Sequence, residues 1–212
     1  IILNKFVQRN IQKYLERLFP INRSITGNGN RKTLKVLKEI IPLSIKEIKS
    51  GKKVYDWTIP KEWNIKDAYI LDKNGDVLIS YKENNLHVVS YSKSVRKNLS
   101  WSELKKKIHF IKGKNLAIPY RTTYYNEDWG FCVNEKQYYK IKKANGPYKI
   151  SIQSSLKKGS LTFGEYLIKG KSKREILIST YICHPSMAND CLSGLILTAF
   201  LAKKIQKIKP KW

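Results

Sequence analysis

The sequence has 212 residues, which allows one ordinary domain or one domain that carries a smaller insertion. Hydrophobic residues make up 42% of the chain and aromatic residues 11%, so we expect a buried core and exclude wholesale disorder. No apolar run approaches the roughly 18–20 residues that a membrane-spanning helix needs, so we exclude a transmembrane protein and expect no membrane partner.

The charge balance is strongly basic, with 42 Lys+Arg against 16 Asp+Glu and a formal net charge of +26. Such an excess would suit nucleic acid, because basic surfaces bind phosphates by counterion release. The excess is mostly lysine, however, and it is spread from Lys5 to Lys211, whereas nucleic-acid readers favour arginine. A solvated lysine surface is therefore the preferred interpretation, and a basic nucleic-acid-binding module is the alternative.

The chain contains three cysteines, Cys132, Cys183 and Cys191. Three cysteines cannot build a disulfide framework and fit a reducing compartment better, so we expect a cytoplasmic protein. The chain begins at Ile1, and its only methionine is Met187. We therefore expect the sequence to be a fragment of a longer protein.

Two helices are predicted near the start of the chain. Apolar residues spaced along one helical face predict a helix over residues 2–19, and Pro20 ends it because proline has no amide hydrogen to donate. A loop over residues 22–30 and a second helix over residues 31–41 follow, with Pro42 at the end of that helix.

The middle of the chain, from about residue 44 to residue 125, has a mostly β pattern. Asn74-Gly75 predicts a type I′ turn between two of its strands. The short alternating segments that indicate strands are residues 53–58, 68–71, 77–81 and 86–91.

The pattern of apolar residues changes again towards the end of the chain. Residues 148–155 and 161–168 are predicted to form neighbouring strands. Residues 176–182 are apolar nearly throughout, as expected of a strand that is covered on both faces. A polar loop over residues 183–194 and a long helix come next, and α/β proteins build their sites in such loops.

Together these elements predict an α/β fold. Residues 1–55 and 123–212 would form one discontinuous domain, in which a mixed sheet is flanked by helices. Residues 56–122 would form a small β-rich inserted domain within it.

The polar loop is where residues that can bind a metal collect. His184 follows the predicted strand, and Asp190 lies close to the start of the next helix. An imidazole suits Zn²⁺, and a carboxylate can bridge two metal ions. The spacing alone leaves a second interpretation open, in which Asp190 caps the helix and His184 is a surface residue, because one His and one Asp do not make a metal site.

The order of the residues in this loop closely resembles the metal-binding segment of a bacterial aminopeptidase-like family. That family is related to the co-catalytic di-zinc aminopeptidases and carboxypeptidases, and its members often accompany polysaccharide-biosynthesis genes. The resemblance covers nearly the whole chain. The segments that carry it are LISTYICHPSMANDCLSG (177–194), FPINRSITG (19–27), DWTIPKEW (56–63), NLHVVSYS (85–92), IPY (118–120), WGFC (129–132) and GSLTFGE (159–165).

The resemblance implies that His184 is a terminal ligand to one zinc ion and that Asp190 bridges both. In the wider group an aspartate two positions after the histidine orients it, but here that position is Ser186, so the imidazole must be oriented by other residues. Cys191 stands where the family usually has asparagine. Its thiol could compete for zinc, but we expect it to be buried and inert.

The resemblance also implies residues that this chain does not contain. The family carries its Glu general base, further acidic ligands and a second histidine later in the sequence, so these are expected beyond Trp212. His87 and His109 are poor substitutes, since both are expected to be structural or surface residues. The chain therefore holds no catalytic residue of its own and is expected to be inactive alone.

The parent protein is accordingly expected to be a zinc-dependent, aminopeptidase-like hydrolase, a metalloprotease with two zinc ions; an inactive scaffold of the same fold is the alternative. A peptide-like or aminoacylated small-molecule substrate is expected, and a homo-oligomer is compatible with the sequence. Arg23, Tyr124 and Trp129 are weak candidates for substrate binding, and packing roles are preferred for all three.

Overall fold

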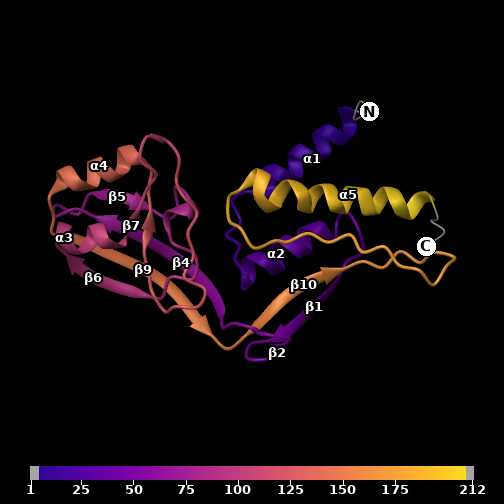
Figure 1. The fold of residues 1–212 in the computed structure, drawn as a ribbon. Coiled ribbons are helices and arrows are strands. Elements are labelled where there is room, and N and C mark those ends of the chain that lie inside the picture. The colour runs from indigo at the N-terminus through magenta and orange to yellow at the C-terminus, as the bar shows by residue number, and fades with distance from the viewer. Residues whose placement is uncertain (1–4, 209–212) are drawn as a thin grey trace. The chain divides into compact units, whose positions relative to one another are not determined.

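The computed structural model describes residues 5–208, with side chains from residue 8 onward. The chain divides into two compact units (Figure 1): unit 1 is Ile1–Ile59 with Gly159–Trp212, and unit 2 is Pro60–Lys158. These units differ from the predicted domains, because unit 2 extends well beyond the predicted insert 56–122. The reason is a long strand, β9 (Tyr148–Lys157), which pairs with strands of the insert.

Within residues 5–208, the helical part of unit 1 consists of α1 (Lys5–Leu18), α2 (Asn28–Leu37), the short segment η3 (Ala188–Leu192) and α5 (Ser193–Ile208). The helix predicted over residues 2–19 is confirmed as α1, although residues 2–4 of that prediction lie outside the described part. The Tyr14 ring of α1 meets the Phe200 ring of α5 edge-on at 5.9 Å. The apolar core that these helices share consists of Leu18, Leu34, Val36, Leu37, Ile40, Ile41, Leu43, Leu192, Leu195, Ile196 and Ala199.

Two short antiparallel strand pairs complete unit 1. β1 (Ser44–Lys49) pairs with β10 (Ser160–Glu165), and β2 (Lys53–Val54) pairs with β3 (Trp57–Thr58). The first pair joins segments that lie more than a hundred residues apart in the sequence. This pair therefore joins the two segments of unit 1 that precede and follow unit 2 in the sequence.

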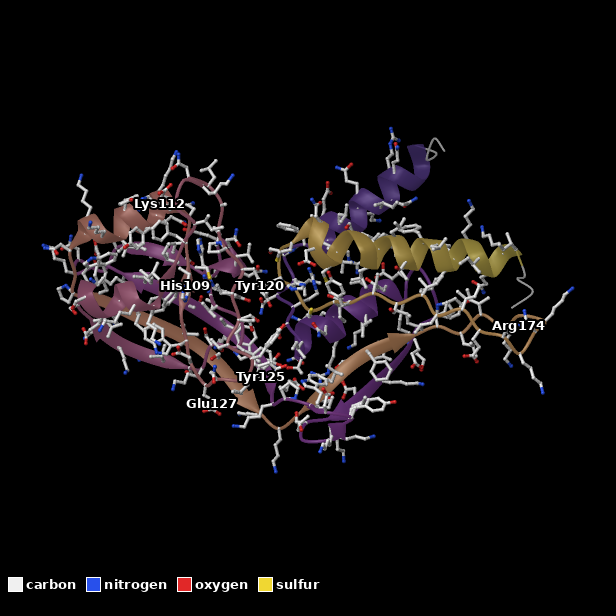
Figure 2. The ribbon with its side chains drawn as sticks, in the orientation of Figure 1. His109, Lys112, Tyr120, Tyr125, Glu127 and Arg174 are labelled. Atoms are coloured by element: carbon white, nitrogen blue, oxygen red, sulfur yellow. The ribbon has the colours of Figure 1, made fainter. Side chains whose placement is uncertain are left out.

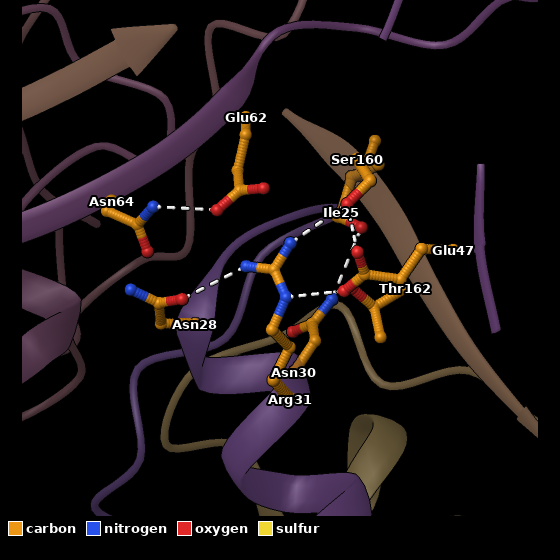
Figure 3. Close-up of polar contacts among 9 residues, drawn as sticks. All are labelled: Ile25, Asn28, Asn30, Arg31, Glu47, Glu62, Asn64, Ser160 and Thr162. Carbon is orange, nitrogen blue, oxygen red and sulfur yellow. Dashed lines mark hydrogen bonds and ion pairs between the residues drawn. The ribbon is translucent and has the colours of Figure 1, made fainter. Parts of the chain in front are cut away.

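Helix α2 begins at Asn28, three residues before the predicted start at Arg31. Figure 3 shows the polar contacts around Arg31: its Nε donates to Glu47 Oε1 at 2.6 Å, and its Nη2 donates to Ser160 Oγ at 2.9 Å. Its Nη1 also donates to the Asn28 side chain. These bonds hold the first turn of α2 against both strands of the β1–β10 pair. The start of α2 thus depends on contacts with distant residues, which the spacing of apolar residues along the helix cannot predict.

Unit 2 is built on a four-stranded antiparallel sheet with the order β5-β4-β9-β6 (Figure 1). β4 (Glu62–Leu71) and β9 form its centre, while β5 (Val77–Ser80) and β6 (Val95–Leu99) are its edges. The other elements of the unit are η1 (Asn85–His87), α3 (Trp101–Leu104), η2 (Lys105–Lys107), β7 (Ile108–His109), β8 (Phe131–Cys132) and α4 (Glu135–Ala144).

The hairpin predicted at Asn74-Gly75 is confirmed, and it joins β4 to β5. The predicted type I′ turn is wrong, because Gly75 has a positive φ of 91° and Asn74 does not. The Asp72 carboxylate instead accepts hydrogen bonds from the main-chain amides of Asn74 and Asp76. An Asx-type turn of this kind fixes the loop through a side chain.

Four other strand predictions need correction. Residues 53–58 form two short paired strands, β2 and β3, in place of one. Residues 86–91 contain the short helix η1 and two isolated bridges in place of a strand. The strands predicted at 148–155 and 161–168 are present as β9 and β10, but they belong to different sheets. Residues 176–182 have no regular secondary structure, because no strand within residues 5–208 pairs with them, and Leu177 is 88% exposed.

Helices and sheets are thus mixed, as the α/β prediction requires, but the predicted mixed sheet is not formed among residues 5–208. The strands there make four separate sheets, and only the two-residue pair β7–β8 is parallel. Within the same residues, no helix is both long and apolar enough to cross a membrane.

Candidate metal-binding loop

The loop before α5 brings His184 and Asp190 together within unit 1. His184 Nδ1 lies 3.7 Å from Asp190 Oδ1, which is too far for a hydrogen bond but brings the two side chains next to each other. The His184 side chain is 17% exposed and the Asp190 side chain 43%, so solvent reaches both. The two side chains therefore lie close together in the folded chain.

Tyr181 is a partner of Asp190 that the sequence analysis missed. Its hydroxyl donates to Asp190 Oδ1 at 2.5 Å, and its ring packs edge-on against the His184 ring at a centroid distance of 5.6 Å. The hydrogen bond and the negative charge of Asp190 raise the pKa of Tyr181. Tyr181 was assigned to a buried strand, and its irregular, exposed conformation is what allows this contact.

The backbone immediately after Asp190 is strained. Cys191 has φ 85° and ψ −64°, a γ-turn conformation that residues other than glycine rarely adopt. The expectation that Cys191 is buried is confirmed, since it is 5% exposed and its thiol donates to the main-chain oxygen of Tyr181 at 3.0 Å. The strained turn thus lies between the Asp190 carboxylate and helix α5.

Cys183 is the other thiol of this loop. Its Sγ lies 3.6 Å from His184 Nδ1. Burial, followed by the nearby Cys191 sulfur, raises the pKa of the Cys183 thiol to about 11. The thiol form is therefore favoured at neutral pH, whereas zinc binding requires the thiolate.

Arg23 is completely buried in unit 1, with an exposed fraction of 0%. Burial lowers the pKa of its guanidinium, and the neighbouring Cys191 sulfur opposes this effect. The guanidinium donates to two main-chain oxygens, of Leu18 and of His184. These contacts are typical of a structural residue, in line with the packing role preferred from the sequence.

The two other weak substrate-binding candidates lie in unit 2. Trp129 belongs to the core of that unit, where its ring contacts Phe131 at a centroid distance of 6.3 Å and Lys107 Nζ lies 5.6 Å from it. Tyr124 is half-buried and packs edge-on against the buried ring of Tyr91. Packing therefore accounts for both aromatic residues.

The remaining histidines, His87 and His109, also lie in unit 2, and Figure 2 labels the second. His87 is buried, and its Nδ1 lies 2.8 Å from the main-chain oxygen of Cys132, an atom that can only accept. Nδ1 must then carry the hydrogen, which leaves Nε2 to accept from the Gln137 side-chain amide at 3.3 Å. Both nitrogens are thus satisfied in the neutral ring, and His87 is a structural histidine.

The neutral His87 leads to a pH prediction. Burial lowers the pKa of His87 in the folded chain, so the unfolded chain binds the proton more readily. The contribution of His87 to stability is complete above the unfolded pKa of about 6.5 and is lost as the pH falls below it, by at most about 1.4 kcal/mol per pH unit. Urea unfolding between pH 7.5 and pH 5 should show a shallower loss for His87→Gln than for wild type; equal slopes would contradict the prediction.

Metal-binding side chains do not gather in larger groups in the described part of the chain. Residues 5–208 contain no cluster of three or more His, Cys, Asp or Glu side chains that could hold a metal ion. A structural or catalytic zinc ion needs at least three protein ligands. His184 and Asp190 can therefore supply only part of such a site.

Comparisons with known proteins place this loop in a wider context. The chain matches the family described as "Domain of unknown function (DUF4910)" over residues 12–212. A Clostridium acetobutylicum protein named "Putative polysaccharide biosynthesis protein with aminopeptidase-like domain" is 50% identical over 216 residues, which cover 99% of this chain and 49% of that protein. A crystal structure of a "putative peptidase" from the same organism has a TM-score of 0.93 and 50% identity, covering 99% of this chain and 50% of its own. The chain thus spans about half the length of these relatives.

Proposed function

The chain belongs to the DUF4910 family, and from this premise we propose that it supplies the first ligands of a two-zinc site in an aminopeptidase-like amide hydrolase. The observation that carries the proposal is the 3.7 Å separation of His184 Nδ1 and Asp190 Oδ1. Two ligands bound tetrahedrally to one zinc ion, each at about 2.0 Å, lie about 3.3 Å apart. A shift of a few tenths of an ångström would let this pair hold one ion.

The chemistry of the donors supports the same proposal. An imidazole nitrogen and a carboxylate oxygen are both common zinc ligands, and a carboxylate has a second oxygen with which to bridge a further ion. The Tyr181 hydroxyl holds one oxygen of Asp190 in place, as partners of metal-binding carboxylates usually do. Zinc would supply an acidified water and polarise the scissile carbonyl. The role of this chain is to hold and orient the ions.

The substrate class rests on the relatives. Their names refer to a peptidase, to an aminopeptidase-like domain and to polysaccharide biosynthesis. A peptide-like or aminoacylated small molecule fits these names, because both present an amide or ester carbonyl beside an amino group. Release of an N-terminal aminoacyl group is the reaction that we propose for the whole protein.

Zinc binding to the chain tests the proposal. Because His184 and Asp190 supply only two ligands, wild type is expected to bind one zinc ion per chain weakly, and isothermal titration would measure the affinity. His184→Ala and Asp190→Asn should each weaken binding by more than the 10–100-fold that loss of an outer partner typically costs. His109→Gln is the matched control, because it removes a histidine from unit 2 and should leave the affinity unchanged.

Two results would count against this function. If wild type takes up no zinc, or if His184→Ala and Asp190→Asn bind it as wild type does, the proposed site is wrong. Amide hydrolysis by a full-length relative is the second measurement. A relative that binds zinc at these positions but cleaves no aminoacyl amide would favour the inactive scaffold.

A further inference from the structure

We propose that Arg23 is a positioning residue that holds the main chain of His184 in place for metal binding. The proposal rests on the proposed function for its consequence, but not for its geometry. Arg23 is fully buried; its Nε donates to the His184 oxygen at 3.0 Å and its Nη1 to the Leu18 oxygen at 2.6 Å. The Arg23 side chain thus connects Leu18, the last residue of α1, with the candidate ligand His184, which lies 161 residues after Arg23 in the sequence.

The choice of arginine follows from this geometry. A guanidinium presents its N–H groups in a rigid, planar fork, so two bonds in different directions hold two carbonyls at a fixed separation. A lysine ammonium is a single point and cannot span both acceptors in the same way. Arg23 Nη2 makes no hydrogen bond with the described residues. The two main-chain bonds are thus made by Nε and Nη1 of this buried cation.

A second contact joins the same two segments. Ser186 Oγ donates to the main-chain oxygen of Phe19 at 3.1 Å, one residue beyond the Leu18 carbonyl that Arg23 binds. The loop that contains His184 is thus tied to the end of α1 at two points. Ser186 occupies the position where the wider zinc group has an orienting aspartate, and here its hydroxyl binds backbone.

The local structure explains why the loop needs these hydrogen bonds. Residues 183–187 have no helix or strand, so main-chain hydrogen bonds of regular structure do not fix them. Metal ligands must be held close to their productive geometry by surrounding contacts. By binding the carbonyl of His184 itself, Arg23 restricts the backbone from which the imidazole projects.

Hydrogen exchange and zinc affinity together test this role. Arg23→Lys should speed amide exchange in peptides covering residues 183–190 by about 10- to 100-fold, as expected for loss of a charge-assisted hydrogen bond. Peptides from β9 in unit 2 should exchange as in wild type. The affinity of the folded variant for zinc should fall by about 10- to 100-fold. Arg17→Lys, in an exposed ion pair with Glu39, is the matched control and should change neither quantity.

The outcomes separate this role from the proposed function. Unchanged exchange in residues 183–190 would overturn the role of Arg23, whether or not the chain binds zinc. If the variant shows faster loop exchange but the wild-type chain binds no zinc, the positioning role of Arg23 is supported and the zinc site is rejected. A lower unfolding free energy with normal loop exchange and zinc affinity would show a purely structural residue and overturn the proposal. Should Arg23→Lys fail to fold, Arg23→Gln, which removes the buried charge and keeps a donor, is judged by the same criteria.

Discussion

Replacing Gly29 with alanine is expected to lower the free energy of unfolding of unit 1 by more than about 4 kcal/mol. Losses of this size are exceptional and arise from defects such as severe overpacking. A Cβ atom at this position would lie 1.7 Å from the main-chain oxygen of Asn22 and 2.7 Å from its carbonyl carbon. Main-chain atoms cannot rotate away as the end of a side chain can. Either the first turn of α2 or the loop before it must therefore move, and the Arg31 contacts depend on that turn.

Gly194→Ala is the matched control, because Gly194 is also a helical glycine. Its added Cβ would meet only Thr180 Oγ1, at an ordinary distance of 3.5 Å. Without a clash, alanine should alter stability by no more than about 1 kcal/mol, in the stabilising direction. Urea unfolding followed by circular dichroism would measure both variants. A Gly29→Ala protein as stable as Gly194→Ala would show that the close approach of α2 to Asn22 is wrong.

Phe131→Ala is expected to cost unit 2 about 3–5 kcal/mol, the range found for removal of a buried aromatic ring. Phe131 is 0% exposed and lies in the core of the unit. Its main chain also pairs with β7 and forms an isolated bridge to Val88. The truncated side chain would leave a cavity where these segments meet, and the surrounding backbone can collapse only partly around it.

Leu116→Ala provides the comparison for Phe131→Ala. Leu116 is 75% exposed, so its truncation should alter stability by no more than about 0.5 kcal/mol. Hydrogen exchange of the β9 amides would report the stability of unit 2 directly. Equal effects of the two substitutions on these amides would contradict the core position of Phe131.

The helices were the most predictable part of the fold. The apolar period identified α1 to within a few residues, because one face of that helix packs into the core of unit 1. Helix α2 was predicted to begin too late. Its first turn is fixed by Arg31 and by Asn30, whose side-chain amide donates to the Ser24 oxygen at 2.7 Å. Contacts between segments of this kind leave no periodic signal.

The strands were less predictable, for two different reasons. β6 was missed because it is an edge strand with the sequence VRKNL, and most of its side chains face solvent. Its sequence therefore lacks the alternation of apolar and polar residues that indicates a strand. Residues 176–182 were predicted as a strand because they are apolar. Apolar composition indicates burial but not a pairing partner, and a strand forms only where such a partner lies alongside.

The two residues of the candidate site could be proposed from the sequence, but their surroundings could not. The sequence of the loop identified His184 and Asp190, and the structure brings them to 3.7 Å. The bond from Tyr181 to Asp190 and the bond from Arg23 to His184 join residues whose relationship depends on the path of the chain. Neither burial of an arginine nor the direction of a loop tyrosine can be derived from spacing along the sequence.

The two points at which the chain passes between the units are neighbours in unit 1. The amide of Ser50 donates to the Gly159 oxygen at 2.9 Å, and the amide of Gly51 donates to the Ile59 oxygen at 2.8 Å. A few residues could therefore join Ile59 to Gly159 while β1 and β10 keep their register, since insertions are tolerated where entry and exit lie close together. Evolution could accordingly enlarge, exchange or delete the module between them while the helices on either side of the candidate loop remain intact.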